Sequence, residues 1–378
     1  MSILEKPASL SHGAANCDAG EVALLTIDLA ALARNFMLLA DRAAPAECAA
    51  VVKADAYGLG LEPVMRALLA AGCRTFFVAT AGEGARARAV SHDAILYVLN
   101  GAPPDSAPLL LSQELRPVLN SLDEVAEWAA HAPKQPAALH IDTGMSRLGV
   151  APHEAGAAAA LARGLPLELV MSHFVSSQQP ENRRNDQQFA QFALARAHFP
   201  DVAASLCNSS GIFLPQRPHL ELVRPGYALY GGNPTPLSPN PMRAIVKLEA
   251  RILALREIKE GESVGYDATW TALRPSRLAT LGLGYADGLP WGASFKPGAP
   301  PFEALVSGFR CPMVGRVSMD AVVLDLTDAP SFIARRGDFV EILGETHGVD
   351  ALAERAGTIG YEILTRLGRR YARRYVGA

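Results

Sequence analysis

The chain has 378 residues, of which 49% are hydrophobic and 19% charged, and its formal net charge is -3. This is the composition of a globular protein with a large core and space for about two domains, not that of a disordered or collagen-like chain. Because no lysine and arginine run forms a nucleic-acid-binding stripe, and no window of about 18 apolar residues forms a membrane span, we expect neither partner.

The five cysteines are scattered and lack the CxxC spacing of a zinc or redox site. They are Cys17, Cys48, Cys73, Cys207 and Cys311. We therefore predict no disulfide framework, no bound metal, and a reducing, cytoplasmic compartment. Residues 1–21 lack the charged start and apolar core of a signal peptide, and we interpret them as a loose N-terminal extension.

Short apolar runs alternate with helix-like segments between residues 22 and 241. The first run, 22–27, precedes the others by a helix and is a candidate to pair with a later sheet. Eight further strand candidates lie at 48–52, 75–79, 94–99, 115–120, 137–142, 167–172, 204–208 and 220–224. This count is typical of a (β/α)8 barrel, whereas a doubly wound sheet has about five or six strands.

The pattern changes after the linker PTPLSPNP at 234–241. Residues 242–378 contain closely spaced strand-like runs punctuated by glycine and proline, with no long helix before ALAERAGT at 351–358. We therefore predict an α/β protein with an N-terminal (β/α)8 TIM-type barrel over 22–241 and a C-terminal, mainly-β domain over 242–378.

Polar residues stand where several of the predicted barrel strands end. They are Lys53, Asp142 with Arg147, His173, Asn208 with Ser209, and Arg224. The carboxyl ends of the strands form the face that carries the active site in this fold. Their convergence at one rim predicts a site there.

Three of these positions have both a chemical and an ordinary interpretation. A desolvated lysine such as Lys53, in VVKADAYGLG, can form a Schiff base, but a lysine that only reaches out to solvent gives the same pattern. The segment CNSSG around Ser209 suits a phosphate or a helix cap. VRPGYALYGG places Arg224 beside Gly226, where an anion or an ordinary loop fits.

Other motifs are equally ambiguous when taken singly. DTGMSRLG (142–149) suits recognition of a carboxylate or phenolate, or an internal pair between Asp142 and Arg147. His173 can be either an active-site residue or a hydrogen-bonded histidine of the core, and GYADG with Tyr285 can be an ordinary structural turn. No HExxH, EF-hand, P-loop, kinase or GxSxG signature occurs, and the strand-GxGxxG-helix context of a dinucleotide fold is missing.

Taken together, the motifs VVKADAYG, DTGMSRLG, NSS with VRPGYALYG, and GYADG with GRVSMD resemble those of the alanine racemase family. Its members are pyridoxal-phosphate enzymes of fold type III, and the resemblance covers roughly residues 22 to 367. It implies an isomerase that interconverts L-alanine and D-alanine, the latter a peptidoglycan precursor, in a homodimer with shared active sites. A biosynthetic and a catabolic role both stay open.

The resemblance also implies residue roles. Lys53 would hold the cofactor and act on D-alanine, while Tyr285 of the other subunit would act on L-alanine from the opposite face. Arg224 would leave the pyridine nitrogen unprotonated, which weakens the electron sink and limits side reactions, and His173 would link Arg224 to Tyr285. Other cofactor contacts would come from Tyr57, Arg147, Asn208, Ser209, Gly226, Tyr227 and Tyr361, and substrate contacts from Arg147 and Met319.

Two positions depart from the family pattern. Many members have a lysine seven residues before Arg147, and its carbamate can brace the arginine, whereas this chain has His140. An imidazole cannot supply that negative charge, so we expect a chloride, a water or another acid to hold Arg147. Ser146 stands where glycine is usual.

Three alternatives remain for the activity. The first is a racemase of broader range, acting on serine or basic amino acids, because one sequence does not define the pocket width. The others are a fold type III decarboxylase, which would not be expected to show both GYADG and DTGMSRLG, and a non-catalytic carrier of pyridoxal phosphate, which would lack the β domain.

Overall fold

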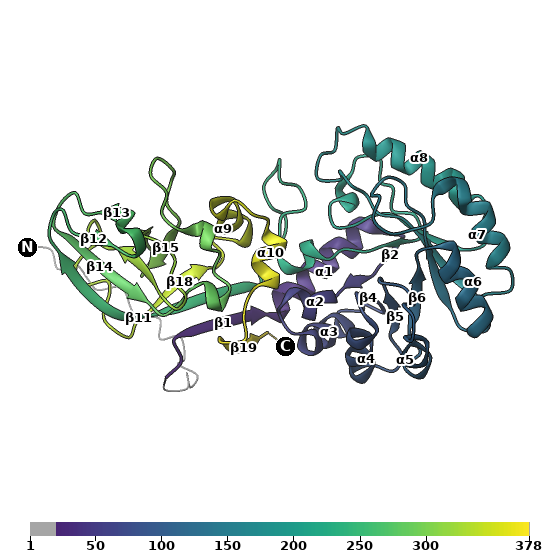
Figure 1. Ribbon diagram of the computed structural model, residues 1–378, viewed down its shortest axis with the longest axis horizontal. Helices are drawn as coiled ribbons and strands as arrows, with labels where there is room; N and C mark the ends of the chain where they lie inside the picture. The colour runs from purple at the N-terminus through teal and green to yellow at the C-terminus, as the bar shows by residue number, and fades with distance from the viewer. Residues whose placement is uncertain (1–19, 378) are drawn as a thin grey trace, which may run out of the picture.

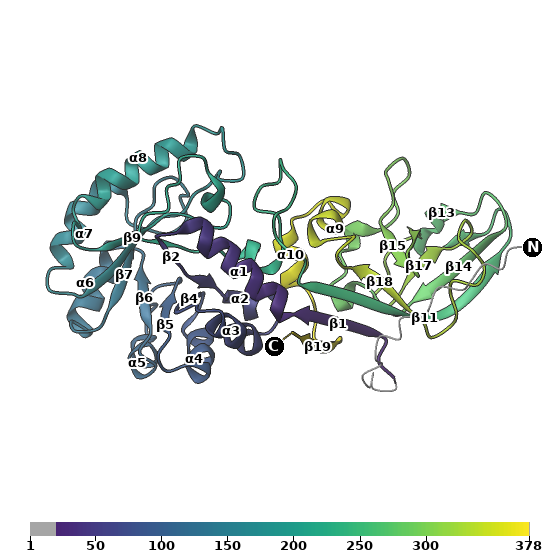
Figure 2. The same ribbon diagram turned by 180° about the vertical axis from the view of Figure 1, so that it is seen from behind.

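The computed structural model describes residues 20–377, which form a barrel and a second region of mainly β structure side by side (Figure 1, and from behind in Figure 2). The predicted N-terminal extension therefore lies outside the described residues except for its last two positions. Within residues 20–377, every helix falls short of the length and apolar character that spanning a bilayer would need.

The predicted barrel is confirmed, and each of the eight predicted runs overlaps at least one of its strands. These are β2 (Glu47–Cys48) and β3 (Ala50–Val51), which divide the first run, β4 (Thr75–Val78), β5 (Ile95–Val98), β6 (Arg116–Leu119), β7 (Ala137–His140), β8 (Leu167–Met171), β9 (Ala203–Ser205) and β10 (Leu222–Val223). Strands β3 to β9 pair in parallel in chain order. The ring closes because β10 pairs with β2, and the Glu221 amide, just before β10, donates to the Ala204 carbonyl of β9 at 3.2 Å.

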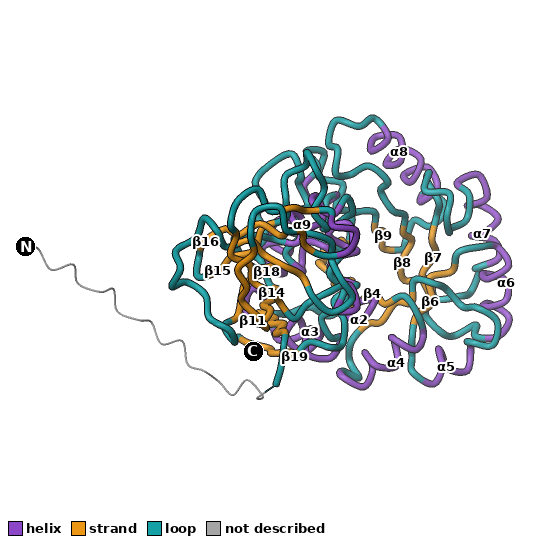
Figure 3. The backbone as a smooth tube through the Cα atoms, turned by 60° about the vertical axis from the view of Figure 1, so that its left-hand side comes forward, coloured by secondary structure: helices purple, strands orange, loops and turns teal. Residues whose placement is uncertain are grey.

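Helices surround these strands, as Figure 3 shows for α4 to α8. They are α1 (Leu29–Ala43), α2 (Lys53–Tyr57), α3 (Leu61–Ala70), α4 (Ala81–Val90), α5 (Ala107–Ser112), α6 (Leu122–His131), α7 (Ala155–Leu161) and α8 (Arg184–Arg196), with short turns η1 (Pro152–Glu154), η2 (Gly211–Phe213) and η3 (Tyr227–Tyr230). Strands covered on both faces must be apolar throughout. Accordingly, Phe76, Phe77 and Val78 of β4 are fully buried.

The second region is built on one long sheet, the mainly-β domain that the sequence predicts. Its strands are β1 (Ala23–Asp28), β11 (Val246–Ile258), β14 (Ser276–Leu281), β15 (Glu303–Val306), β16 (Phe309–Val314), β17 (Val322–Asp325), β18 (Phe339–Leu343) and β19 (Ala372–Val376). A hairpin of β12 (Ser263–Val264) and β13 (Trp270–Thr271), the turns η4 (Tyr266–Ala268), η5 (Tyr285–Asp287) and η6 (Trp291–Ala293), and helices α9 (Val349–Ala356) and α10 (Gly360–Thr365) complete it.

Strand β1 ties the two regions together. It pairs antiparallel with β11 and parallel with β19, so the earliest described strand belongs to the second sheet. Its last residue, Asp28, then caps α1 of the barrel by accepting a hydrogen bond from the Ala31 amide at 2.8 Å. The domain boundary at 241 and 242 falls between η3 and β11 and stays a prediction.

Candidate functional site

A cavity of about 710 Å³ opens where the barrel strands end, and α10 of the β domain lies against it. Ten of the predicted site residues line this cavity: Lys53, Tyr57, Arg147, His173, Asn208, Ser209, Arg224, Gly226, Tyr227 and Tyr361. They come from residue 53 to residue 361 of the chain. Parallel strands that end at one rim, with one helix added from the second sheet, are what bring them together.

Lys53 lies two residues after the end of β3 and begins a turn of unusual handedness. Residues 54 to 57 all have positive φ, between 53° and 55°, although none is glycine, so the segment labelled α2 is a left-handed turn. This conformation costs roughly 1–2 kcal/mol per residue and persists only where surrounding contacts impose it. The pKa of Lys53 is lowered, first by burial and then by the nearby Arg147 guanidinium. Lowering the pKa enlarges the fraction of neutral, nucleophilic amine.

Hydroxyl groups and one glycine form a cradle beside Lys53. The Ser209 hydroxyl accepts hydrogen bonds from the amides of Gly226 and Ala228, each at 3.1 Å. A Cβ atom at residue 226 would lie 2.3 Å from the Tyr57 hydroxyl oxygen, so only glycine lets the backbone approach this closely. The pKa of the half-buried Tyr361 is raised to about 12, mainly by burial, which keeps its hydroxyl a hydrogen-bond donor.

Arg224 is the deepest charge in the site, with 4% of its surface exposed. Its guanidinium donates to the Ser172 carbonyl at 2.6 Å and to the Ser205 hydroxyl. Burial lowers its pKa to about 10, so the group is still charged at neutral pH. Its two described acceptors belong to the backbone and to a neutral side chain, and no carboxylate within residues 20–377 neutralises it.

The two histidines of the site are neutral. Burial, followed by the charge of Arg224, lowers the pKa of His173 to about 3 and that of His140 to about 4. The Nδ1 atom of His140 lies 3.0 Å from the Asn120 side-chain oxygen and donates to it. Neither of the two described acceptors of the Arg224 guanidinium is the His173 ring, and the predicted link from Arg224 through His173 to Tyr285 of a second subunit stays a prediction.

The DTGMSRLG turn presents Arg147 to the cavity without a partner among the described residues. Asp142 instead accepts from the amides of Gly144 at 2.9 Å and Met145 at 2.7 Å, so the alternative of an internal pair with Arg147 is wrong. Ser146 has φ 53°, the conformation that favours glycine, which is the residue usual in the family at this position. A chloride, water or acid at Arg147 stays a prediction.

Tyr285 and Met319, the remaining predicted site residues, lie outside the cavity. They are brought together on the β domain because the amides of Tyr285 and Ala286 donate to the carbonyls of Ser318 and Met319, each at 3.0 Å. Their side chains are 44% and 53% exposed. The single chain therefore holds two separate groups of predicted site residues.

The sequence reasoning missed several residues at the cavity. Asn100 lines it and follows the predicted strand 94–99, so the strand-end rule that found Lys53 applies to it as well. Asp350 does not line the cavity itself, but its carboxylate accepts a 2.6 Å hydrogen bond from the hydroxyl of the cavity residue Tyr227, and it carried no signal in the sequence. His140 also lines the cavity, although it was noted only as a departure from the family pattern.

The residues present fit pyridoxal phosphate, the expected cofactor. An amine with a lowered pKa suits its aldehyde, and the hydroxyls of Tyr57, Ser209 and Tyr361 with the Gly226 backbone suit its phosphate. The buried Arg224 suits a ring nitrogen that remains unprotonated. Within residues 20–377, no cluster of His, Cys, Asp and Glu suits a metal ion.

Comparison with known proteins gives consistent matches over nearly the whole chain. Residues 27–234 match the family model "Alanine racemase, N-terminal domain", and residues 245–375 match "Alanine racemase, C-terminal domain". The chain is 54% identical to an alanine racemase of Methylobacterium sp. (strain 4-46) over 94% of this chain and 98% of that one. It is 53% identical to one of Methylobacterium nodulans over 98% of each chain.

Solved structures are similar as well. The crystal structure of alanine racemase from Bartonella henselae with covalently bound pyridoxal phosphate superposes with a TM-score of 0.88 at 38% identity. The match covers 94% of this chain and 99% of that chain. The similarity in sequence and the similarity in fold thus both extend over the barrel and the β domain.

Proposed function

The chain belongs to the alanine racemase family, and we propose that it interconverts L-alanine and D-alanine with two bases, Lys53 of one copy and Tyr285 of a second. The enzyme uses pyridoxal phosphate, which acts as an electron sink that makes the α-proton of the bound amino acid removable. The remaining steps rest on the residues of this chain.

The division of the site residues between two places supports this proposal. Lys53 lies in the cavity, whereas Tyr285 is 44% exposed on the β domain and does not line it. Inverting a stereocentre needs proton removal on one face and delivery on the other, so two acid–base groups are required. A second copy docked over the cavity supplies the other group, which makes the active unit a homodimer with shared sites.

Lys53 holds the cofactor and exchanges a proton through its Nζ atom on one face of the substrate. Its lowered pKa favours the neutral amine that this role needs. The partner subunit's Tyr285 exchanges a proton through its hydroxyl on the opposite face. On this assignment Lys53 serves D-alanine and the partner's Tyr285 serves L-alanine.

Two arginines orient the substrate and the cofactor in the site. Arg147 has donors without a described partner, and these bind the substrate carboxylate together with the partner's Met319 backbone. Arg224 would face the pyridine nitrogen of the cofactor, and because a guanidinium keeps its protons at neutral pH, it would limit electron withdrawal by the ring. Tyr57, Ser209, Gly226 and Tyr361 would hold the phosphate, Asn208 and Tyr227 would make further contacts with the cofactor, and His173 would link Arg224 to the partner's Tyr285.

The cellular setting is part of the proposal. We assign the enzyme to the cytoplasm, since its four described cysteines, all buried, are free thiols, as a reducing compartment favours. The barrel over 22–241 carries the cofactor, and the β domain over 242–378 carries the groups that the partner uses.

A mixed-dimer experiment tests the shared site. Lys53→Ala and Tyr285→Phe homodimers are expected to lose racemisation of alanine. Refolded together in equal amounts, they should recover about a quarter of the wild-type activity, since half of the random dimers then contain one intact site of two. No recovery on mixing would show that each chain supplies both bases, and full activity of either homodimer would overturn the two-base assignment.

The substrate assignment has its own test. Racemisation of L-alanine should exceed that of L-serine, L-lysine and L-arginine under the same conditions. Faster turnover of a basic amino acid would favour the broader racemase, and release of carbon dioxide would favour a decarboxylase.

A further inference from the structure

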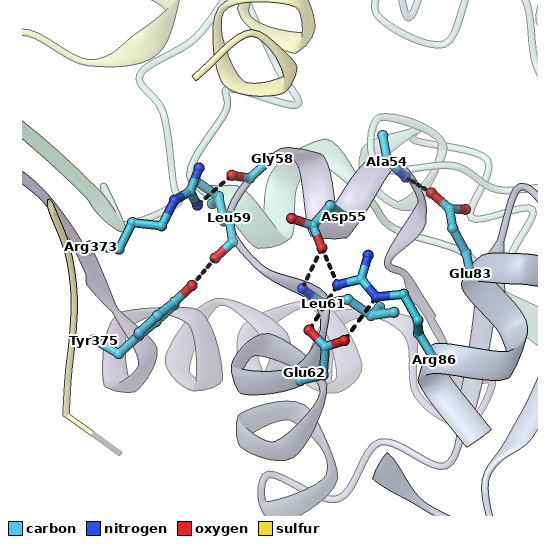
Figure 4. Close-up of polar contacts among 10 residues, drawn as sticks. All are labelled: Ala54, Asp55, Gly58, Leu59, Leu61, Glu62, Glu83, Arg86, Arg373 and Tyr375. Carbon is cyan, nitrogen blue, oxygen red and sulfur yellow. Dashed lines mark hydrogen bonds and ion pairs between the residues drawn. The ribbon is translucent and has the colours of Figure 1, made fainter. Parts of the chain in front are cut away.

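The left-handed turn after Lys53 is held from two directions, as Figure 4 shows. On the barrel side, Glu83 of α4 accepts a hydrogen bond from the Ala54 amide at 2.7 Å. Arg86 of the same helix donates to the Asp55 carboxylate at 2.6 Å, and that carboxylate also accepts from the Leu61 amide at 3.1 Å. These contacts secure the start of the turn.

The second set of contacts comes from β19, at the far end of the sequence. The Arg373 guanidinium donates to the Gly58 carbonyl at 2.7 Å, and the Tyr375 hydroxyl donates to the Leu59 carbonyl at 2.9 Å (Figure 4). Both carbonyls follow Tyr57 directly. The end of the turn that presents Lys53 and Tyr57 to the cavity is therefore held by the β domain.

Arg373 has a second attachment on the β-domain side. Its other terminal nitrogen donates to the carbonyls of Gly368 at 3.1 Å and Leu367 at 3.3 Å. The amide of Gly368 in turn donates to the Asp287 carbonyl at 3.0 Å. Asp287 is the last residue of η5, the turn that begins with Tyr285.

The η5 turn is itself tightly fixed. The Asp287 carboxylate accepts from the Gly284 amide at 2.9 Å and pairs with Arg370 at 3.2 Å, although its side chain is 5% exposed. Arg370 also pairs with Asp320, next to Met319, at 2.8 Å. Gly368 is therefore connected through Asp287 to the turn of Tyr285, and through Asp287 and Arg370 to Asp320 beside Met319.

We propose that Arg373 is a positioning residue for the reaction, tying the turn of Lys53 and Tyr57 to the segment that supports Tyr285. The inference rests on the proposed function, because it takes Lys53 and Tyr285 as the two bases. A guanidinium presents several donors in a planar fork, so it holds three carbonyls at once, whereas a lysine ammonium cannot span them. In the homodimer, Lys53 and Tyr285 of the same chain belong to two different active sites. A single Arg373 side chain therefore supports one base in each site.

The chain offers a matched control. Arg369 lies in the same segment, is exposed, and forms no described side-chain hydrogen bond or ion pair within residues 20–377. In the holoenzyme, Arg373→Met and Arg373→Lys should each lower kcat by about ten- to a hundredfold, the usual effect of a small misplacement of a reacting group. Arg369→Met should leave kcat unchanged, and Tyr375→Phe, which removes one hydrogen bond, should have a smaller effect than either Arg373 variant.

A readout independent of activity separates positioning from simple loss of stability. The visible circular dichroism of the bound cofactor, measured per bound cofactor, should decrease in Arg373→Met because the turn of Lys53 no longer fixes its orientation. A lower melting temperature with unchanged dichroism and kcat would reduce Arg373 to a structural residue and overturn the proposal. If Arg373→Met fails to fold, Tyr375→Phe supplies the same test at the Lys53 turn.

Mixed dimers then test the two halves of the brace separately. When Arg373→Met is placed on the Lys53→Ala chain and mixed with Tyr285→Phe, the intact site takes only its Tyr285 from the altered chain. When it is placed on the Tyr285→Phe chain and mixed with Lys53→Ala, the intact site takes only its Lys53 from there. Both mixtures should be slower than the parent mixture; an effect in only one would refute the shared brace, while an inactive parent mixture would instead refute the proposed function.

Discussion

The rings of Tyr227 and Tyr361 lie almost parallel, with centroids 4.0 Å apart and an interplanar angle of 11°. Tyr227 belongs to η3 at the end of the barrel, and Tyr361 belongs to α10 of the β domain. The pair joins the two regions at the wall of the cavity. The ring of Tyr57 lies beside it, 6.2 Å from that of Tyr361, so three tyrosines are positioned together.

Replacing Tyr361 should therefore weaken cofactor binding through two separable effects. Tyr361→Phe removes the hydroxyl but keeps the stacked ring, whereas Tyr361→Ala removes both. Since stacked aromatic pairs contribute about 1 kcal/mol, we expect the Kd for pyridoxal phosphate to be about fivefold higher in Tyr361→Ala than in Tyr361→Phe. Absorbance titration of the two apoproteins measures this, and equal Kd values would show that the stack does not support the site.

Arg147 should control the protonation of Lys53. The Arg147 charge is the second cause, after burial, of the lowered Lys53 pKa, so Arg147→Met should raise that pKa. The pH dependence of Lys53 acylation in the apoprotein, followed by mass spectrometry, should shift to higher pH. Arg163→Met, at an exposed arginine away from the cavity, is the control; a matching profile for both variants would contradict the expected coupling.

His140 should make the apoprotein sensitive to acid. Its pKa is lowered from 6.5 to about 4 in the folded chain, so between these values the unfolded chain binds more protons and acid favours unfolding. The loss of unfolding free energy from this group is on the order of 3 kcal/mol as the pH falls from 6.5 to 4. Urea unfolding at several pH values should show a smaller decline in His140→Gln, and an unchanged decline would assign it to other groups.

Gly58 should tolerate no side chain, because of both its backbone and its surroundings. Its φ is +81°, and a Cβ atom would lie 2.5 Å from the Leu364 carbonyl oxygen of α10. Gly164 has a similar φ of +88° but nothing within 4 Å, so Gly164→Ala reports the backbone strain alone. Gly58→Ala should lower the free energy of unfolding by about 1–3 kcal/mol more than Gly164→Ala. Equal losses in urea unfolding would mean that α10 moves aside without cost.

Much of the fold was predictable because its signals are local. The apolar runs that end at Lys53, His173 and Arg224 are short and regularly repeated, and strands buried on both faces have to be apolar. The strand-end rule then located the barrel side of the site, and ten predicted residues line one cavity. The same rule would also have identified Asn100.

The left-handed turn at 54–57 was not predictable in this way. Alanine and tyrosine, which occupy three of the four positions, do not favour positive φ, so their own preferences argue against the conformation that they adopt. The groups that impose it are Glu83, Arg86, Arg373 and Tyr375, and the last two are separated from the turn by more than three hundred residues. A long-range contact of this kind leaves no periodic signal.

The sequence by itself determined the barrel, the β domain and the identity of the groups around the cavity, because side-chain chemistry and strand patterning act over short distances. The tertiary structure alone decided how these groups are held. It buried Arg224 against Ser172 and Ser205, left Arg147 without a described partner, and placed Tyr285 on an exposed face away from Lys53. These relationships depend on which distant segments pack together, and that is determined by the closed barrel and the shared sheet of β1, β11 and β19.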